Sequence, residues 1–308
     1  MVDELHENKR KEAAERWKGT TSGTEGMHRV LGRLIRLVGL RTVYAIAALF
    51  VVPVAVIINS SSRKAIYKFH RKSGRSKLEA VVSMWKSHFV FSRVVIDRFA
   101  AFAGIRFDME IEGYDYFGRL VDEPEGFAQL SSHTGGYEMA GFFLKSNQKP
   151  IKVLVFGGEK ESIRKGRQNL FKNTNVSMIF AEGDGSMAHV FEMNRALDDG
   201  EILSMPADRL FGSSKSFIIP FLGEPARFPQ GPFMVVASKN VPAIFVAVMR
   251  EKTKKYRVIV HPLEWKAGDL KLPVKKRAEI IARQYAEILE NTVKRYPFQW
   301  FNFYDFWT

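Results

Sequence analysis

The stretch FAQLSSHTGGYEMAGFFL, residues 127–144, has the pattern of a strand, a glycine turn and the start of a helix. Its first six residues favour a strand, the paired glycines Gly135 and Gly136 break it, and the residues that follow favour a helix. His133 is then expected at the carboxyl end of the strand, and Glu138 in the first turn of the helix. In open α/β sheets, ligands bind at that edge.

The same alternation of strand and helix continues on the carboxyl-terminal side. Further β-rich runs fall at residues 151–157, 176–181, 201–206, 243–249 and 256–262, and helix-like stretches at 136–147, 159–172, 186–199 and 232–240. The run at 241–249 is continuously apolar, as expected of a strand buried on both faces. The pattern predicts an α/β fold, a mixed sheet flanked by helices.

Helical patterns open and close this domain. Residues 63–104 have apolar positions at helical spacing, and residues 274–295 form an amphipathic helix that Pro297 ends. The last twelve residues carry seven aromatic side chains. We expect them to pack on the core, with a membrane interface as the alternative.

The amino-terminal part has a different composition. Residues 1–28 are expected to be a polar tail, 29–60 a membrane-associated or transmembrane helical segment, and 61–308 the α/β domain, with 61–104 as its helical lead-in. The apolar run at 37–58 would span about 33 Å as a helix, close to one hydrocarbon core. Pro53 should kink this helix, so spanning and interfacial placement both stay open, as does a buried core helix.

The charge distribution supports the membrane alternative. The net charge is +14, and residues 26–78 hold eleven Lys or Arg and no Asp or Glu. Such a block suits anionic lipid or nucleic acid on charge alone. The apolar run inside it favours lipid, and no nucleic-acid-binding motif is present. The absence of cysteine excludes disulfides, thiolate metal sites and a cysteine nucleophile, and no zinc ligand set or phosphate-binding glycine loop occurs.

His133 and Glu138 could cooperate chemically. A carboxylate bonded to one imidazole nitrogen fixes the tautomer and leaves the other nitrogen to accept a proton. Across a strand–turn–helix corner these two side chains can meet. The alternative is a histidine that only satisfies a loop carbonyl, and the residues alone do not choose between them. The adjacent Ser131 and Ser132 are expected to be structural.

Three segments in order resemble the lipid A secondary acyltransferases, the lauroyl and myristoyl transferases of the lysophospholipid acyltransferase-like group. They are the His-x4-Glu pair at residues 133–138, the segment MPADRLFGSSKSFIIPFLGEPARFPQG at 205–231, and RYPFQWFNF at 295–303. The similarity covers roughly residues 30–304. Two departures stand out: Phe298 occupies a position where Glu is usual, and Arg209 follows Asp208 where a second acid is usual.

The resemblance implies transfer of a fatty acyl chain from acyl carrier protein to a hydroxyl of a lipid A-type glycolipid precursor, at the cytoplasmic face of the inner membrane. It implies that His133 is the general base and Glu138 its orienting partner. No metal or cofactor is implied, and the acyl carrier protein thioester is the co-substrate. Direct attack by the hydroxyl agrees with the lack of a Gly-x-Ser-x-Gly elbow.

Supporting roles fall on four further residues. The tetrahedral oxyanion needs donors, for which the backbone N–H groups of Gly135 and Gly136, or a basic side chain from residues 163–173, are predicted. Arg167 is favoured over Arg164 and Lys172 as the basic residue. Asp208 is expected to hold the acceptor or the surroundings of the dyad.

Two other functions compete with this one. The first keeps acyl transfer but changes the acceptor to a glycerolipid, an amino-acid lipid or a polyene pigment. The second is a non-catalytic, basic, membrane-binding protein with an incidental His-x4-Glu pair.

Overall fold

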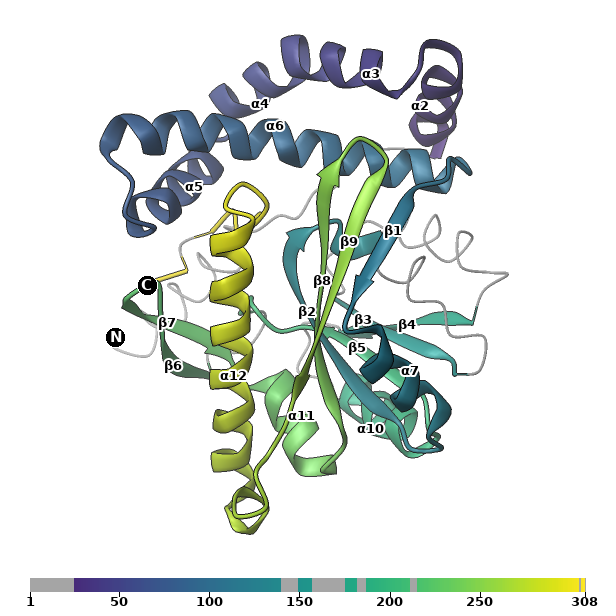
Figure 1. Cartoon of the computed structure of the whole chain (residues 1–308), viewed down its shortest axis with the longest axis vertical. Coiled ribbons are helices and arrows are strands. Elements are labelled where there is room, and N and C mark those ends of the chain that lie inside the picture. Colours follow the sequence, from purple (N-terminus) through teal and green to yellow (C-terminus); the bar gives the residue numbers. More distant parts are fainter. Residues whose placement is uncertain are drawn as a thin grey trace, which may run out of the picture.

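The computed structural model describes residues 25–139, 149–156, 175–181, 187–210, 215–304 and 306–307, and Figure 1 shows their arrangement. The predicted helix at 159–172 and most of the one at 136–147 lie outside the described residues.

A mixed sheet forms the centre of the domain and confirms the predicted fold class. Within the described residues it has seven strands in the order β1-β9-β8-β2-β5-β3-β4. Their bounds are β1 Asp108–Glu112, β2 Phe127–Gly135, β3 Ile151–Phe156, β4 Val176–Ala181, β5 Ile202–Pro206, β8 Ala243–Lys252 and β9 Lys255–Leu263. Neighbouring strands pair in parallel except β8 and β9, which form an antiparallel hairpin.

The strands β2 and β8 lie at the middle of the sheet, and β8 begins with a continuous apolar run. Every residue from Ala243 to Met249 is buried, which explains why this run has no polar alternation. Because β2 pairs with β5 on one side and β8 on the other, its carboxyl end lies between theirs.

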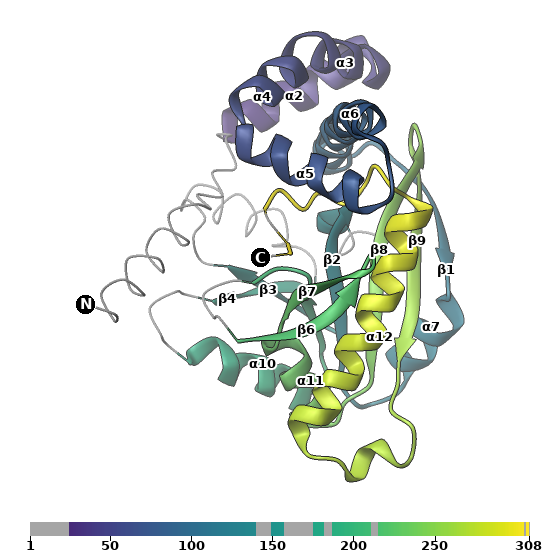
Figure 2. The same ribbon diagram turned by 90° about the vertical axis from the view of Figure 1, so that its left-hand side faces the viewer.

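Helices cover both faces of the sheet. One apolar core joins it to α10 (Ala188–Asp198), α11 (Gly231–Lys239), α12 (Val274–Arg295) and the separate hairpin of β6 (Ser216–Phe221) with β7 (Glu224–Pro229). A second core joins the sheet to α7 (Tyr114–Asp122). Figure 2 shows α12 and α7 at different sides of the β8–β9 hairpin. The aromatic carboxyl terminus packs on the first core, as predicted, through Trp300 and Phe306.

The amino-terminal helices form a layer across one end of the sheet, as both ribbon views show (Figures 1 and 2). They are α2 (Glu25–Val38), α3 (Leu40–Ile46), the π-helical turn Ala47–Val51, α4 (Val52–Ile58), α5 (Ser60–Lys72) and α6 (Lys77–Phe102). Helix α6 begins with a capping box between Ser76 and Glu79. The π-helical turn ends two residues before Pro53, which has no N–H to continue an α-helical ladder.

One helix in this layer, Leu40–Ile58, is long and apolar enough to cross a membrane by length and composition, with a mean hydropathy of 2.2. It packs against α6 through one face, where Val43, Tyr44 and Val56 are buried. Its other face leaves large apolar side chains exposed, namely Ile46, Leu49, Phe50, Val51, Val54, Ile57 and Ile58. Together with the family described below, this exposed apolar face indicates membrane association.

The sequence patterns missed several short elements. Strand β1, helix α7 and the β6–β7 hairpin were not anticipated, because short segments carry few periods of either pattern. At the central turn, β2 continues through His133 to Gly135, and the residues after it form a 3-10 turn, Tyr137–Met139.

Candidate active site

The backbone around His133 is irregular. The pairing of β2 with β8 shifts register between Ser131 and Gly135, so His133 lies in a bulged part of the strand. The phenol of Tyr285 on α12 donates a 2.7 Å hydrogen bond to the carbonyl oxygen of Ser131 and ties the strand down just before the bulge. The side chain of His133 is 12% exposed, so the protein covers most of the imidazole but not all of it.

Asp208 is the carboxylate that holds His133. Its Oδ1 lies 2.7 Å from His133 Nδ1, and its Oδ2 accepts a 2.9 Å hydrogen bond from the backbone N–H of His133. The sheet explains the contact: Ser131 is in register with Pro206, and the N–H of Ala207 bonds to the carbonyl of Ser131. The parallel strands β2 and β5 thus bring together His133, near the end of β2, and Asp208, just after β5.

The electrostatics of this pair favour a neutral base. Burial lowers the pKa of His133, and the nearby Arg209 guanidinium lowers it further, against the opposing influence of Asp208. For Asp208, burial raises the pKa, but the contacts with His133 and the charge of Arg209 outweigh it and hold the pKa below its ordinary value. At neutral pH an ionised Asp208 then accepts Nδ1–H from a neutral His133, and Nε2 carries the free lone pair.

The carboxyl-terminal residues Gln299, Trp300 and Phe301, here called the C-terminal brace, hold the same loop from the other side. The N–H of Gly135 donates to the carbonyl of Gln299 at 2.7 Å, and the N–H of Phe301 donates to the carbonyl of His133 at 2.8 Å. The indole Nε1–H of Trp300 donates to Asp208 Oδ2 at 3.2 Å. The brace therefore fixes both the backbone of the base and the carboxylate that orients it.

The Gln299 side chain carries this support to β8. Its Oε1 accepts from the N–H of Arg250 at 2.8 Å, and its Nε2 donates to the Arg250 carbonyl at 2.7 Å. The Arg250 guanidinium in turn forms a 2.8 Å ion pair with the fully buried Asp97 of α6. Asp97 also accepts hydrogen bonds from Tyr256 and from Tyr44 of the apolar helix. A continuous polar network therefore runs from the apolar helix to the active-site loop.

Glu138 does not orient His133 in this structure, which corrects the prediction. Its carboxylate forms an ion pair with Arg98 of α6 and accepts a 3.3 Å hydrogen bond from Tyr137. The reason is local: β2 extends two residues beyond His133, so Glu138 leaves the loop on the side of α6. The ring of Tyr137 packs beside the imidazole, with the ring centroids 5.0 Å apart.

The predicted oxyanion donors are also corrected. The N–H of Gly135 is bonded to Gln299, and the N–H of Gly136 donates to the carbonyl of Val248 at 2.6 Å, so neither points at a substrate. The glycines serve packing instead: a Cβ on Gly135 would lie 2.1 Å from the Val248 carbonyl oxygen, and Gly135 has a positive φ of 47°. Only glycine fits there.

The remaining predicted residues divide in two. Asp208 lies in the site, while Arg167 is outside the described residues, so its position stays a prediction. Among the described residues, no cluster of His, Asp and Glu is arranged to hold a metal ion. The sequence signal that could have found the His133–Asp208 contact is that each residue lies within two positions of the end of a buried strand.

The site is an α/β sheet that presents a carboxylate-held imidazole near the carboxyl end of a central strand, an arrangement with the chemistry that a general base requires. The comparison with protein families is more specific. Residues 54–308 match the family model of the bacterial lipid A biosynthesis acyltransferases, and the chain belongs to that family. No curated protein sequence matches the chain. Membership confirms the resemblance and indicates an acyltransferase that acts on a lipid acceptor.

Proposed function

We propose that the protein transfers a fatty acyl chain from the thioester of acyl carrier protein to a hydroxyl of a lipid A-type glycolipid precursor. The observation that carries the proposal is the 2.7 Å contact between His133 Nδ1 and Asp208 Oδ1. It leaves Nε2 as the only imidazole nitrogen able to take a proton from an acceptor hydroxyl.

The reaction needs one base and no covalent enzyme intermediate. His133 Nε2 takes the proton of the acceptor hydroxyl while its oxygen attacks the thioester carbonyl carbon. The tetrahedral oxyanion collapses, the carbon–sulfur bond breaks, and the imidazolium returns the proton to the departing thiolate. The products are the lipid ester and the free thiol of the carrier.

Asp208 has two roles in this scheme. It keeps His133 in the tautomer with the proton on Nδ1, and its negative charge stabilises the imidazolium that forms during attack. Because Asp208 is 1% exposed, water screens that charge little. The oxyanion requires separate donors, for which Arg167 in the predicted basic segment stays our proposal.

The apolar helix supports placement of the reaction at a membrane. We place the protein on the inner membrane with its catalytic domain in the cytoplasm, where the acidic carrier protein delivers the chain. The excess of basic residues would steer that carrier electrostatically. A scaffold without activity would have no need for the buried imidazole–carboxylate pair.

The test is acyl transfer by detergent-purified protein, with an acylated carrier protein as donor and a lipid A precursor as acceptor. His133→Ala should lose on the order of 10² to 10⁴ in rate and keep its circular dichroism and membrane fraction. His189→Ala, on an α10 helix away from β2, is the matched control and should keep full activity. Full activity of His133→Ala would refute the role of the base.

The acceptor is tested separately by mass spectrometry of lipids from a deletion strain. Loss of one acyl chain from the lipid A fraction supports the proposed acceptor. A change confined to glycerolipids, amino-acid lipids or pigments would replace it with one of those classes.

A further inference from the structure

The apolar helix Leu40–Ile58 packs against α6 along its whole length. Both ribbon views show it beside α6, across one end of the sheet (Figures 1 and 2). Each of its three segments, α3, the π-helical turn and α4, contacts α6. The buried side chains of this contact extend from the first residue of the helix almost to its end, and are Leu40, Val43, Tyr44, Ala47, Val52 and Val56. A helix that crosses a bilayer instead leaves the water-soluble domain, because its full length lies in hydrocarbon.

The helices before and after it pack on the same partner. Ile35 of α2 belongs to one apolar cluster with the start of the apolar helix and with Ile96 of α6. Ile66 of α5 belongs to another cluster with the second half of the apolar helix and with Met84 of α6. Arg63 of α5 also donates a 2.8 Å hydrogen bond to a backbone carbonyl at the carboxyl end of the apolar helix. The chain therefore returns to α6 after this helix, whereas a span would carry α5 to the opposite face of the membrane, about 28 Å away.

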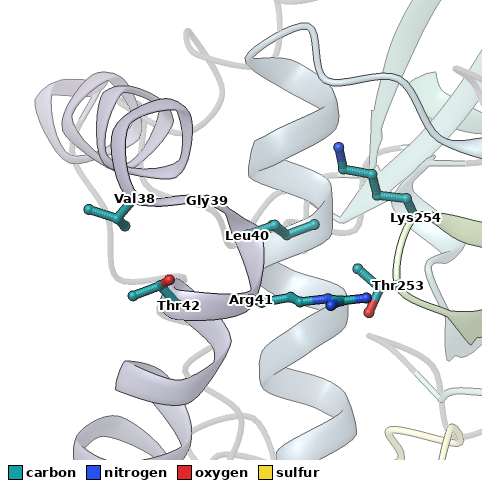
Figure 3. Close-up of a pocket in the computed structure, with 7 residues that line it drawn as sticks. All are labelled: Val38, Gly39, Leu40, Arg41, Thr42, Thr253 and Lys254. Atoms are coloured by element: carbon teal, nitrogen blue, oxygen red, sulfur yellow. The ribbon is translucent and has the colours of Figure 1, made fainter.

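Polar groups tie the start of the apolar helix to the β8–β9 hairpin. Tyr44 donates to the buried Asp97 of α6, which pairs with Arg250 of β8 at 2.8 Å. Figure 3 shows Thr253 and Lys254 of the hairpin turn lining a hollow with the first residues of the helix. Strand ends and turns do not occur in lipid-exposed hydrocarbon, because their backbone groups would lose their hydrogen bonds to water. A helix held against this hairpin therefore stays at the level of the membrane surface.

The face of the apolar helix that points away from α6 is apolar and exposed. Leu49, Phe50, Ile57 and Ile58 are each between 68% and 71% exposed. A helix with one face on protein and the other apolar and exposed fits a position in the plane of the membrane surface, with the exposed face toward the acyl chains.

Basic residues flank both ends of the helix. Residues 26–78 hold eleven Lys or Arg and no Asp or Glu, and both flanks contain some of them. Lys and Arg next to membrane segments concentrate on the cytoplasmic side, so a span would leave one basic flank on the disfavoured side. With both ends at one surface, all of these cations can face the anionic headgroups of the same leaflet.

We propose that Leu40–Ile58 lies along one leaflet of the membrane and does not cross it. The lipid surface is then the partner of the exposed apolar face, and α2, α5 and the catalytic domain all lie on one side. The proposal rests on the membrane association of the helix and not on the acyl-transfer function. Its test therefore measures position and needs no activity.

The first experiment compares the sides on which three positions lie. The chain has no cysteine, so a single introduced cysteine reports one position. Arg33→Cys lies before the apolar helix, Lys64→Cys after it and Lys275→Cys on α12 of the catalytic domain, and all three positions are exposed. Each full-length variant is treated with a membrane-impermeant maleimide in intact and in lysed spheroplasts of the expressing bacterium.

We expect the three variants to behave alike, with no labelling in intact spheroplasts and full labelling after lysis. Opposite results for Arg33→Cys and Lys64→Cys would show that the helix crosses the membrane and would overturn the proposal. If all three react in intact spheroplasts, the inference stands and the cytoplasmic placement of the catalytic domain is wrong.

The second experiment measures depth with spin labels at Ile46→Cys, Phe50→Cys and Ile57→Cys, in vesicles of phosphatidylethanolamine and phosphatidylglycerol. The first and last of these exposed positions are about 16 Å apart along the helix axis. A helix along one leaflet places all three labels at the same depth, about 5–10 Å below the headgroup boundary. A label at Phe50 near the bilayer centre, with the label at Ile57 near the opposite surface, would overturn the proposal.

Leu270→Cys is the matched control, because Leu270 is an exposed leucine in the segment between β9 and α12. Its label should be fully accessible to a water-soluble relaxation agent. Equal accessibility of the Phe50 label would overturn the membrane as the partner of the apolar face.

Discussion

His133 Nδ1 and Asp208 Oδ1 lie 2.7 Å apart although the two residues are 75 positions apart in the chain. The contact exists because β2 and β5 are parallel neighbours, so the residues after each strand meet at one edge of the sheet. The His-x4-Glu pair, read locally, suggested a different carboxylate. The long-range partner has the geometry of a base-orienting group, and the local one forms an ion pair with Arg98.

Asp208→Asn should reduce activity more than Glu138→Gln. Asp208 Oδ1 accepts from His133 Nδ1, and its Oδ2 accepts from the backbone N–H of His133 and from Trp300 Nε1. Asparagine keeps one accepting oxygen, and its NH₂ group cannot accept the hydrogen bonds made to the other. We expect a rate loss on the order of 10² to 10⁴ and a stability loss of about 1–3 kcal/mol from unsatisfied buried donors.

The matched change at Glu138 alters a carboxylate that pairs with Arg98 and accepts from Tyr137 but does not contact His133, and it should cost less than tenfold in rate. Transfer rates and thermal melts on the same purified variants check both statements. The reverse order would show that Glu138, after a rearrangement on substrate binding, is the orienting group.

The activity should have an acid limb set by His133. The base must be unprotonated, and burial lowers its pKa below the ordinary value of about 6.5. The rate constant kcat/KM should therefore stay high down to pH 6.5 and fall at lower pH.

The same lowered pKa has a consequence for stability. At pH values between the pKa of His133 in the folded state and that in the unfolded state, the unfolded state binds more protons. His133 therefore lowers the free energy of unfolding as the pH falls through about 6.5. Circular dichroism at each pH separates loss of fold from loss of rate. An acid limb with its midpoint above pH 7 would contradict the neutral, buried base.

Gln299→Leu should damage the site through the C-terminal brace. The change leaves the N–H and carbonyl of Arg250 without their side-chain partner. It also loosens the brace, whose backbone forms hydrogen bonds with Gly135 and His133. We expect a stability loss of about 1–3 kcal/mol, because Gln299 is 7% exposed, and a fall in kcat larger than any change in KM.

The chain offers a close control in Gln284, whose side chain bonds in the same two-fold manner to the backbone of Glu264 at an exposed position. Gln284→Leu should stay within about 0.5 kcal/mol of the wild type and keep its activity, since water can replace the lost bonds. Similar behaviour of both variants would refute the role of the brace.

Tyr44→Phe should loosen the apolar helix from the catalytic domain. It removes one hydroxyl that donates to Asp97 at a fully buried position, and leaves the ring in place. A stability loss of about 1–3 kcal/mol is expected from the carboxylate left short of a donor.

The control is Tyr296→Phe, which removes a hydroxyl that donates to the Glu251 carboxylate at an exposed position. It should change stability by less than about 0.5 kcal/mol. Denaturant melts in detergent measure both. Equal stability of Tyr44→Phe and the wild type would show that the network does not hold the helix.

The sequence predicted the parts of the fold with strong periodicity. The buried strand at 243–249, the amphipathic helix at 274–295 and the long helices after residue 60 occur where the patterns place them. His133 could be predicted as a site residue because a turn after a strand needs the two glycines but does not need a histidine beside them. Its partner was not assigned, because strand order decides which carboxylate arrives there, and no local spacing encodes that order.

The residues that support the site could not be predicted from local sequence patterns, for a related reason. Gln299 and Trp300 lie in an aromatic tail whose composition indicates only burial, and Asp97 lies within a helix with a weak apolar face. Their roles follow from contacts across 49 or more residues, such as Gln299 with Arg250 and Trp300 with Asp208. The prediction that the two glycine N–H groups bind the oxyanion was wrong because both groups already donate to backbone carbonyls of neighbouring segments.

The position of the C-terminal brace in the chain means that the active-site loop can be completed only late in synthesis. The apolar helix, Leu40–Ile58, leaves the ribosome early, while Gln299, Trp300 and Phe301 emerge near the end of synthesis. Until they do, the loop of His133 lacks two of its backbone bonds, and Asp208 lacks its indole donor. The nascent chain can therefore reach a membrane long before its catalytic loop can be fixed, and a chain interrupted before Gln299 would be delivered there without an organised base.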